Sequence, residues 1–363
     1  MGKYKLINNV LGWIVFAIAS TVYLMTMEPT ASFWDCGEFI SSAYKLEVGH
    51  PPGAPFFMLT ANLFTQLASD PSTVAKMVNT MSALFSGLTI LFLFWSITHL
   101  ARKIMVKDGE EASLGQMITV MGSGLVGALA YTFSDTFWFS AVEGEVYAYS
   151  SLFTAVVFWL ILKWEAVADK PHADRWIVLI AYLMGLSIGV HLLNLLCIPA
   201  IVLVYYYKKF PNPTMKGTLV ALLASFAIVA LMMYGVVQGL VEVCGYFELL
   251  FVNVLGMPYN SGVFAYVIIV AGVLIWSIWE TMRDEIHPTR MKIAFILSVV
   301  LIGIPFIGSG YVLAVILTAA LSLYLFKSKK VDIKTLNTIL VCLMVVVVGY
   351  SSYALTLIRA TAD

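Results

Sequence analysis

The feature that most constrains this chain is a series of long apolar runs separated by short polar segments. A helix needs about 20 apolar residues to cross a bilayer. Nine runs approach or exceed that length: Leu6–Met27, Val74–Leu100, Leu114–Phe133, Tyr147–Trp164, Trp176–Tyr207, Thr218–Gln238, Val263–Trp279, Ile293–Phe326 and Leu336–Ile358. With 61% hydrophobic and 12% charged residues, the composition excludes a soluble globule or a disordered chain. Zero net charge argues against a nucleic-acid partner. We expect an all-α polytopic membrane protein.

The basic residues predict how the chain is threaded through the membrane. Cytoplasmic loops collect Lys and Arg, and eighteen of the 21 basic residues fall into six clusters, at 3–5, 102–107, 163–175, 208–216, 283–292 and 327–334. Trp176–Tyr207 and Ile293–Phe326 have such a cluster at both ends, so each is expected to be a hairpin. The predicted turns are His191–Asn194 and Pro305–Gly310. About eleven spans follow, with the N-terminus in the cytoplasm and the C-terminus outside.

The two predicted hairpins are short. Each leg would hold about 16–17 residues, or about 25 Å of helix, less than the hydrocarbon core of about 30 Å. We therefore expect a recess in the outer face, where non-helical backbone is tolerated if it lines a wet cavity. Asn194 is expected to be accessible there.

The predicted outer side is acidic, and two of its segments are long, at 28–73 and 238–262. Before the C-terminal tail, this side carries two lysines and ten acids. The acids are Glu28, Asp35, Glu38, Glu47, Asp70, Asp135, Glu143, Glu145, Glu242 and Glu248. A loop of more than about 12–15 residues between compact elements is usually functional. We therefore expect the chemistry on this side of a single transmembrane domain, 1–363.

The first outer segment is predicted to hold two interfacial helices. Over Glu38–Val48, polar residues recur at helical spacing opposite an apolar face, which is typical of a helix in the membrane interface. His50-Pro-Pro-Gly53 ends this helix. Pro55 then occupies the favoured first-turn position of a second helix, Phe56–Ala68.

Asp35 and Glu38 precede the first of these helices and allow two interpretations. Their spacing is that of a capping box, in which Asp35 is the N-cap and Glu38 bonds back to the Asp35 amide. The pair could also act in catalysis, because an ionised Asp in a dry interfacial pocket can accept a proton from a hydroxyl. The two roles can coexist.

Other outer residues are candidates for binding. Glu143 and Glu145 lie among aromatic residues, either in a solvated turn or as ligands of a divalent ion, sugar hydroxyls or a cationic group, because buried carboxylates need partners. An ionisable residue at membrane depth, such as His191, is a functional candidate, although a structural histidine is an equal alternative. Asn194 shares its turn, and Asn253 lies at the polar end of a predicted interfacial helix, Phe247–Gly262.

Most of the cysteines and three of the glycines are interpreted as packing residues. The four cysteines are too far apart for a metal-ligand spacing, and Cys197, Cys244 and Cys342 lie in apolar stretches as expected of small buried side chains. Gly122, Gly124 and Gly127 lie inside a span and indicate close helix packing.

The outer motifs resemble those of a known family. Trp34-Asp-Cys-Gly-Glu38-Phe-Ile and Gly49-His-Pro-Pro-Gly53-Ala-Pro55 are similar to the Asp-x-Gly-Glu and His-Pro-Pro-Gly signatures of the protein O-mannosyl-transferase-like family, whose layout is that of GT-C glycosyltransferases. The family includes a bacterial domain of unknown function (2723) and the eukaryotic transmembrane protein 260. Further matching motifs are Thr136–Trp138, Glu143–Tyr147, Gly189–Leu192, Phe251–Pro258 and Asn260–Gly262.

The resemblance implies transfer of a sugar from a polyprenyl-phosphate carrier to a Ser or Thr hydroxyl of an extracytoplasmic protein. Asp35 would match the catalytic Asp of the first loop, with Glu38 beside it. The expected partners are the lipid-borne sugar donor, the acceptor protein and membrane lipids. The expected location is a bacterial inner membrane. Family members usually continue into a soluble outer region, which we expect to be absent here because the chain ends at Asp363.

A leaving phosphate needs positive charge. The outer candidates are His50, Lys76, His191, Lys45 and Arg359, of which His191 and Lys76 are favoured. No cofactor is expected, although a divalent metal on Glu143 or Glu145 could replace the cation. A non-catalytic envelope scaffold and a transporter or lipid-carrier flippase stay open as alternatives, but a transporter would want charges along a two-sided path.

Overall fold

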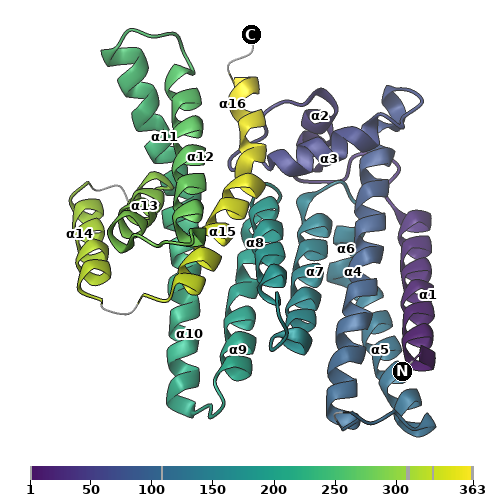
Figure 1. The fold of residues 1–363 in the computed structure, drawn as a ribbon. Helices are drawn as coiled ribbons and strands as arrows, with labels where there is room; N and C mark the ends of the chain where they lie inside the picture. The colour runs from purple at the N-terminus through teal and green to yellow at the C-terminus, as the bar shows by residue number, and fades with distance from the viewer. Residues whose placement is uncertain (1, 108, 308–310, 329–330, 361–363) are drawn as a thin grey trace. The chain divides into compact units, whose positions relative to one another are not determined.

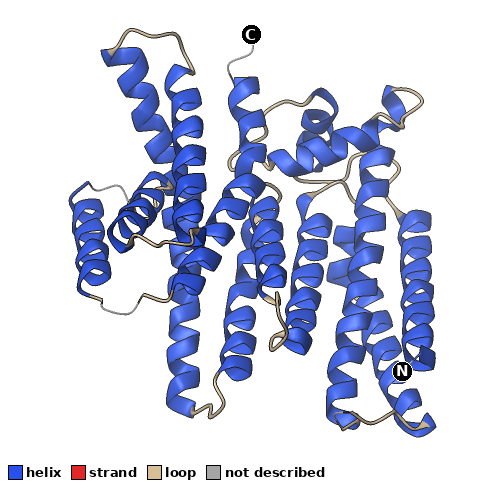
Figure 2. Cartoon of the chain, in the orientation of Figure 1, coloured by secondary structure: helices blue, strands red, loops and turns tan. Residues whose placement is uncertain are grey.

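The computed structural model describes residues 2–107, 109–307, 311–328 and 331–360. These residues form helices and connecting loops, and no strand occurs among them (Figure 2). Eight helical segments are long and apolar enough to cross a membrane: Gly2–Thr26, Pro71–Met105, Leu114–Thr132, Val146–Val167, Leu192–Lys209, Met215–Val254, Ser261–Met282 and Ile333–Arg359. The predicted class, an all-α polytopic membrane protein, is confirmed. The count of eleven spans stays a prediction.

The helices pack into two compact units. Unit 1 contains the described residues of Met1–Cys197 and Val346–Asp363, and unit 2 contains those of Ile198–Val345. The first loop, the acid pair at 143–145 and the turn at 189–194 all belong to unit 1.

Unit 1 is built around α4 (Val74–Met105). This helix packs against α1 (Gly2–Thr26), α5 (Leu114–Thr132) and α7 (Val146–Val167). Two short helices, α2 (Cys36–Lys45) and α3 (Pro55–Thr65), lie across the end where α1 stops and α4 begins (Figure 1). They bury Phe39, Phe57 and Met58 against α4 and α7 in one apolar cluster. Helices are therefore present at both places where interfacial helices were predicted, and Pro55 occupies the first turn of α3 as expected. Their position in the membrane interface stays a prediction.

The remaining elements of unit 1 connect these helices. A short turn of 3-10 helix, η1 (Pro71–Thr73), leads into α4, and α6 (Asp135–Ala141) lies between α5 and α7. Helix α8 (Asp174–Ile188) follows α7, and η2 (Leu192–Leu196) follows α8. The chain returns to unit 1 at the end of α15 (Ile333–Tyr350) and continues through η5 (Ser351–Tyr353) and α16 (Ala354–Ala360).

The two runs predicted to be short hairpins are both broken into short helices. In the first run, α8 has 15 residues and α9 (Cys197–Lys209) has 13. In the second, α13 (Pro288–Leu301) has 14 and α14 (Tyr311–Lys327) has 17. The first break falls at residues 189–196, at the expected turn. Of the second expected turn, residues 308–310 lie outside the described residues.

Unit 2 departs from the sequence prediction at residue 238. The helix expected to end there continues from α10 (Met215–Ala230) through η3 (Leu231–Gln238), α11 (Gly239–Leu249) and η4 (Leu250–Val254), 40 residues in all. The separate interfacial helix expected over Phe247–Gly262 is therefore wrong. No proline interrupts this stretch, and its π-helical turns, η3 and η4, keep the backbone helical. Helix α12 (Ser261–Met282) begins after a short loop.

Candidate functional site

The first residues of α2 do not form the expected capping box. Asp35 occupies the N-cap position, but its side chain makes no capping hydrogen bond. Glu38 does not bond back to the Asp35 amide, because its carboxylate is taken by His50: the His50 backbone N–H donates to Oε1 at 2.6 Å. The capping-box interpretation is therefore wrong, and both carboxylates are free of the helix terminus.

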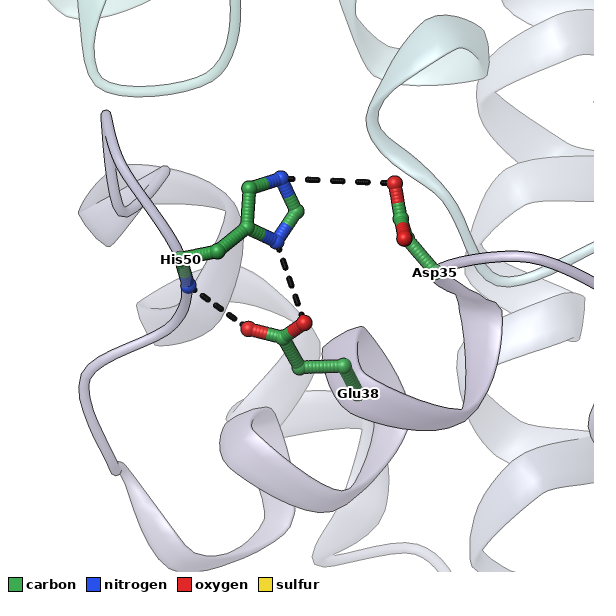
Figure 3. Close-up of side chains that lie close together, drawn as sticks. All are labelled: Asp35, Glu38 and His50. Atoms are coloured by element: carbon green, nitrogen blue, oxygen red, sulfur yellow. Dashed lines mark hydrogen bonds and ion pairs between the residues drawn. The ribbon is translucent and has the colours of Figure 1, made fainter.

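Asp35, Glu38 and His50 form a small cluster at the surface. The His50 ring lies between the two carboxylates, with Nδ1 at 3.1 Å from Glu38 Oε2 and Nε2 at 4.0 Å from Asp35 Oδ2 (Figure 3). The side chains of Asp35, Glu38 and His50 are 55%, 39% and 44% exposed. The expected dry pocket around Asp35 is thus replaced by an open surface site.

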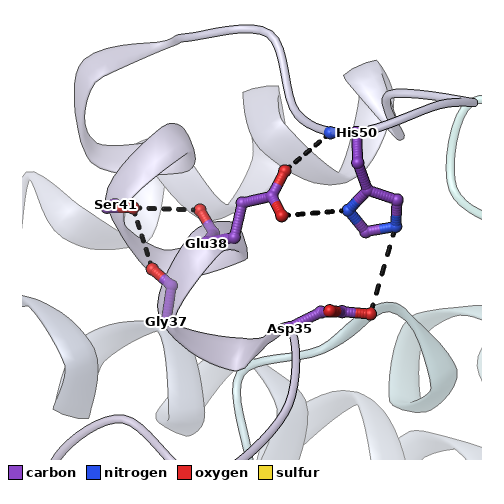
Figure 4. A network of polar contacts seen from close by, with 5 residues as sticks. All are labelled: Asp35, Gly37, Glu38, Ser41 and His50. Atoms are coloured by element: carbon purple, nitrogen blue, oxygen red, sulfur yellow. Dashed lines mark hydrogen bonds and ion pairs between the residues drawn. The ribbon is translucent and has the colours of Figure 1, made fainter.

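Local backbone geometry brings His50 to α2. Leu46 ends the helix in the left-handed region, and the chain then turns back along it. Gly49 is buried beside Glu38, where an added Cβ would lie 3.4 Å from Glu38 Oε1 and 3.0 Å from Met58 Cε. Figure 4 shows the result, with Ser41 bonded to the carbonyls of Gly37 and Glu38 while the Glu38 carboxylate points to His50.

A second cluster lies against the first turn of α2. Possible ligand atoms of Cys36, Glu143 and Glu145 lie within 4.8 Å of one another. Cys36 is 1% exposed and Glu143 is 3% exposed. The two glutamates come from the turn between α6 and α7, which the Glu28 backbone N–H holds by donating to the Val142 carbonyl at 3.0 Å. The acid pair is therefore partly buried, unlike the solvated turn that the sequence left open.

Charge links the two clusters. Burial, followed by the negative charges of Glu143 and Asp35, raises the pKa of Glu145 to about 7. Burial also raises the pKa of Glu143, while hydrogen bonds from His50 lower the pKa of Glu38. Since the Asp35 charge acts on Glu145, we treat both clusters as one carboxylate site, made of Asp35, Cys36, Glu38, His50, Glu143 and Glu145.

Two asparagines that the sequence analysis did not select hold this region together. Asn79 of α4 is fully buried, and its amide nitrogen donates to the carbonyls of Glu28 at 2.7 Å and Thr30 at 3.0 Å. Asn62 of α3 donates to the carbonyls of Ala43 and Tyr44 at the end of α2. A buried amide in an apolar helix is a usable signal, because it needs hydrogen-bond partners. Cys36 was also missed, since one thiol carries little information alone.

The other predicted residues lie outside the carboxylate site. His191 packs its ring against Tyr147 and accepts a hydrogen bond from the Leu193 N–H, and burial lowers its pKa. Asn194 is fully buried and donates to Ser187 Oγ at 2.9 Å, so it does not face an open recess. Lys76 is exposed in the first turn of α4. Asn253 lies in η4 of unit 2.

Two sets of side chains in the site have the donor atoms to hold a cation. One is Asp35, Glu38 and His50, and the other is Cys36, Glu143 and Glu145. In the second set, burial raises the pKa of the thiol to about 12 and also raises the pKa of both glutamates. The negative charges of Glu143 and Glu145 also repel each other. A proton or a cation would relieve this repulsion, and two carboxylates are suitable oxygen ligands for Mg²⁺ or Mn²⁺.

Comparisons with known proteins identify the segment that carries the site. Residues 35–214 match the description "Protein O-mannosyl-transferase TMEM260 N-terminal domain". The protein O-mannosyl-transferase TMEM260 of Mus musculus is 28% identical over 174 residues, covering 48% of this chain and 22% of the relative. The protein of the same name from Dictyostelium discoideum is 25% identical over 187 residues, covering 50% and 21%.

The chain thus aligns with about a fifth of the length of these relatives. No solved structure matches it. The family resemblance predicted from the first-loop motifs is confirmed within residues 35–214, while the motifs at 251–262 lie beyond the matched segment.

Proposed function

Since residues 35–214 carry an N-terminal domain of the protein O-mannosyl-transferase-like family, we propose that this protein is a membrane glycosyltransferase. It would move a sugar from a polyprenyl-phosphate carrier to a Ser or Thr hydroxyl of an extracytoplasmic protein. The carboxylate site, which lies within the matched segment at the acidic end of unit 1, is the observation that carries the proposal. A bacterial inner membrane is the proposed location.

Asp35 is the proposed general base. Its carboxylate makes no capping hydrogen bond and is 55% exposed, so an acceptor hydroxyl can reach it. In a single displacement, Asp35 takes the hydroxyl proton while the acceptor oxygen attacks the anomeric carbon. The bond from that carbon to the phosphate oxygen breaks, and polyprenyl phosphate leaves with the electron pair. The configuration at the anomeric carbon is inverted.

The leaving phosphate requires compensating positive charge. Of the cations considered from the sequence, His50 lies inside the site, 4.0 Å from Asp35. His191 is a weaker candidate, because its burial favours the neutral imidazole, and Lys76 lies outside the site. We therefore assign this role to His50, positioned by Glu38. A divalent ion held by Glu143 and Glu145 would supply the same charge.

Replacing the proposed base tests the function directly. A general base contributes about 10²–10⁴-fold, so Asp35→Asn is expected to lose at least about 100-fold in transfer. The assay follows hexose transfer from a polyprenyl-phosphate donor to a Ser/Thr peptide in proteoliposomes, by mass spectrometry. Asp70→Asn, in the same loop but in the η1 cap, is the matched control and is expected to stay active.

The outcomes separate the classes of function. Near-wild-type transfer by Asp35→Asn would remove Asp35 from the mechanism. Movement of the carrier lipid without a new glycosidic bond would indicate a transporter, and neither activity would indicate a scaffold.

Chelation distinguishes the two sources of positive charge. If His50 supplies it, EDTA is expected to leave transfer unchanged, while His50→Gln reduces it at least about tenfold, since removal of one electrostatic stabiliser commonly costs that much or more. Loss of transfer in EDTA, with recovery on adding Mg²⁺ or Mn²⁺, would contradict the assignment to His50 and assign the positive charge to a divalent ion.

A further inference from the structure

A cavity of about 380 Å³ lies in unit 1 at the opposite end of the helices from the carboxylate site. It is formed by the first turns of α1, the last turns of α4 and the last turns of α7. Three cations line it, Lys5, Arg102 and Lys163, and none of the described residues in its wall is acidic. Such a wall favours an anionic ligand.

Aromatic rings hold two of the three cations. The Arg102 guanidinium lies 4.8 Å from the centre of the Tyr4 ring, and Lys163 Nζ lies 4.7 Å from that of Trp159. The nearby Glu165 forms its ion pair with Lys103, which does not line the cavity. Arg102 and Lys163 are thus ordered, and no acid of the described cavity wall offsets the positive charge.

The cavity also leaves polar atoms without partners. Arg102 Nε, a donor, and Asn8 Oδ1, an acceptor, are buried and have no hydrogen-bond partner among the described residues. Buried polar groups are normally satisfied, so each such group needs an explanation. Both atoms are enclosed by protein, so a ligand in the cavity would bond to them once the Arg102 and Asn8 side chains turn toward it.

The position of the cavity indicates where such a ligand comes from. Leu6 and Val10, on the same turns of α1 as Lys5 and Asn8, are 64% and 49% exposed. In a membrane-spanning helix these side chains face acyl chains. Basic pockets between transmembrane helices are suited to lipid headgroups, and basic ends face the cytoplasm.

We propose that this cavity binds the phosphate headgroup of an anionic phospholipid from the inner leaflet. Lys5, Arg102 and Lys163 would contact the phosphate, and Asn8 would turn its amide toward a headgroup hydroxyl. The ligand would be bound 1:1 and would fasten α1 to α4 and α7. This binding is independent of the proposed transferase activity.

The test counts retained lipids on the full chain. Protein is reconstituted in nanodiscs of phosphatidylcholine with phosphatidylglycerol, and native mass spectrometry measures the phosphatidylglycerol that stays bound after release. Each basic residue near a membrane surface contributes about fivefold in affinity to anionic lipid. Arg102→Gln and Lys163→Gln are each expected to reduce retention about fivefold. Lys107→Gln, at the same end but outside the cavity, is the control and should retain lipid normally.

A second variant controls for misfolding caused by the removal of a basic side chain. Asn9→Asp places a negative charge on an exposed cavity residue while all the cations remain, and it should also reduce retention. Equal retention by the wild type and all the cavity variants would overturn the proposal. So would displacement of the lipid by millimolar inorganic phosphate with no preference for phosphatidylglycerol over phosphatidylcholine, because that result assigns the cavity to a soluble anion.

Discussion

At the scale of single residues, the two halves of the carboxylate site differ in their surroundings, and this difference controls their charge. Glu38 accepts hydrogen bonds from His50, which favour the ionised form and lower its pKa. Glu145 lies partly buried beside Glu143. Its burial and the negative charge of Glu143 both favour the protonated form of Glu145. The site can therefore hold one ionised acid and one protonated acid near neutral pH, without any change of structure.

The raised pKa of Glu145 predicts a pH-dependent stability. The ordinary pKa of this group is 4.5, and folding raises it to about 7. Between these values the folded state keeps a proton that the unfolded state has released, so stability falls as the pH rises. The Tm of detergent-solubilised protein is expected to fall from about pH 5 to about pH 8, and to fall less in Glu145→Gln. An equal decrease of the Tm in the two proteins would show that Glu145 is not the group responsible.

At the scale of elements, the packing of α5 on α4 depends on particular glycines. A Cβ on Gly124 would lie 2.5 Å from Thr98 Cγ2 and 2.8 Å from the Phe94 ring, and one on Gly127 would lie 2.7 Å from Ile97 Cδ1. Gly122 has nothing within 4 Å of its Cβ position. The predicted packing role is therefore observed for Gly124 and Gly127 but not for Gly122, which faces away from α4.

This contrast supplies a matched pair of variants. Gly124→Leu is expected to destabilise the protein by about 1–3 kcal/mol, because overpacking forces neighbouring side chains or backbone to move. Gly122→Leu adds the same side chain to the same helix and should leave the Tm within error of the wild type. Thermal unfolding in detergent, followed by intrinsic fluorescence, measures both. A similar decrease of the Tm in the two variants would show that the close approach of α5 to α4 does not cause the destabilisation.

At the scale of the whole molecule, the charges of unit 1 separate along its helices. Lys3, Lys5, Arg102 and Lys163 lie at one end, and the carboxylate site lies at the other. The positive-inside rule then places the basic end in the cytoplasm and the carboxylate site outside. This orientation, like the GT-C architecture, is a prediction, and it is necessary for an enzyme that uses lipid-borne sugars on the outer face.

Cysteine labelling tests this orientation. Ser69→Cys, in the exposed turn after α3, is expected to react with a membrane-impermeant maleimide in intact cells. Lys107→Cys, after α4, should react only after permeabilisation. Cys244 and Cys342 are partly exposed and are first replaced by Ser, while Cys36 and Cys197 are buried. Labelling of Lys107→Cys from outside would reverse the orientation and exclude the proposed extracytoplasmic chemistry.

The sequence by itself determined the elements whose cause is local. Run length and polarity predicted the spanning helices, and Pro55 predicted the start of α3, because helix formation and membrane insertion depend on neighbouring residues. The interpretation of Asp35 and Glu38 as a capping box, which used only their spacing, was wrong. The partner of Glu38 is His50, twelve positions away. Only the tertiary structure decided that Cys36 meets Glu143 and Glu145, and that Asn79 holds the start of the first loop. Those contacts join residues far apart in the chain, and packing against α4, rather than sequence spacing, sets their distances.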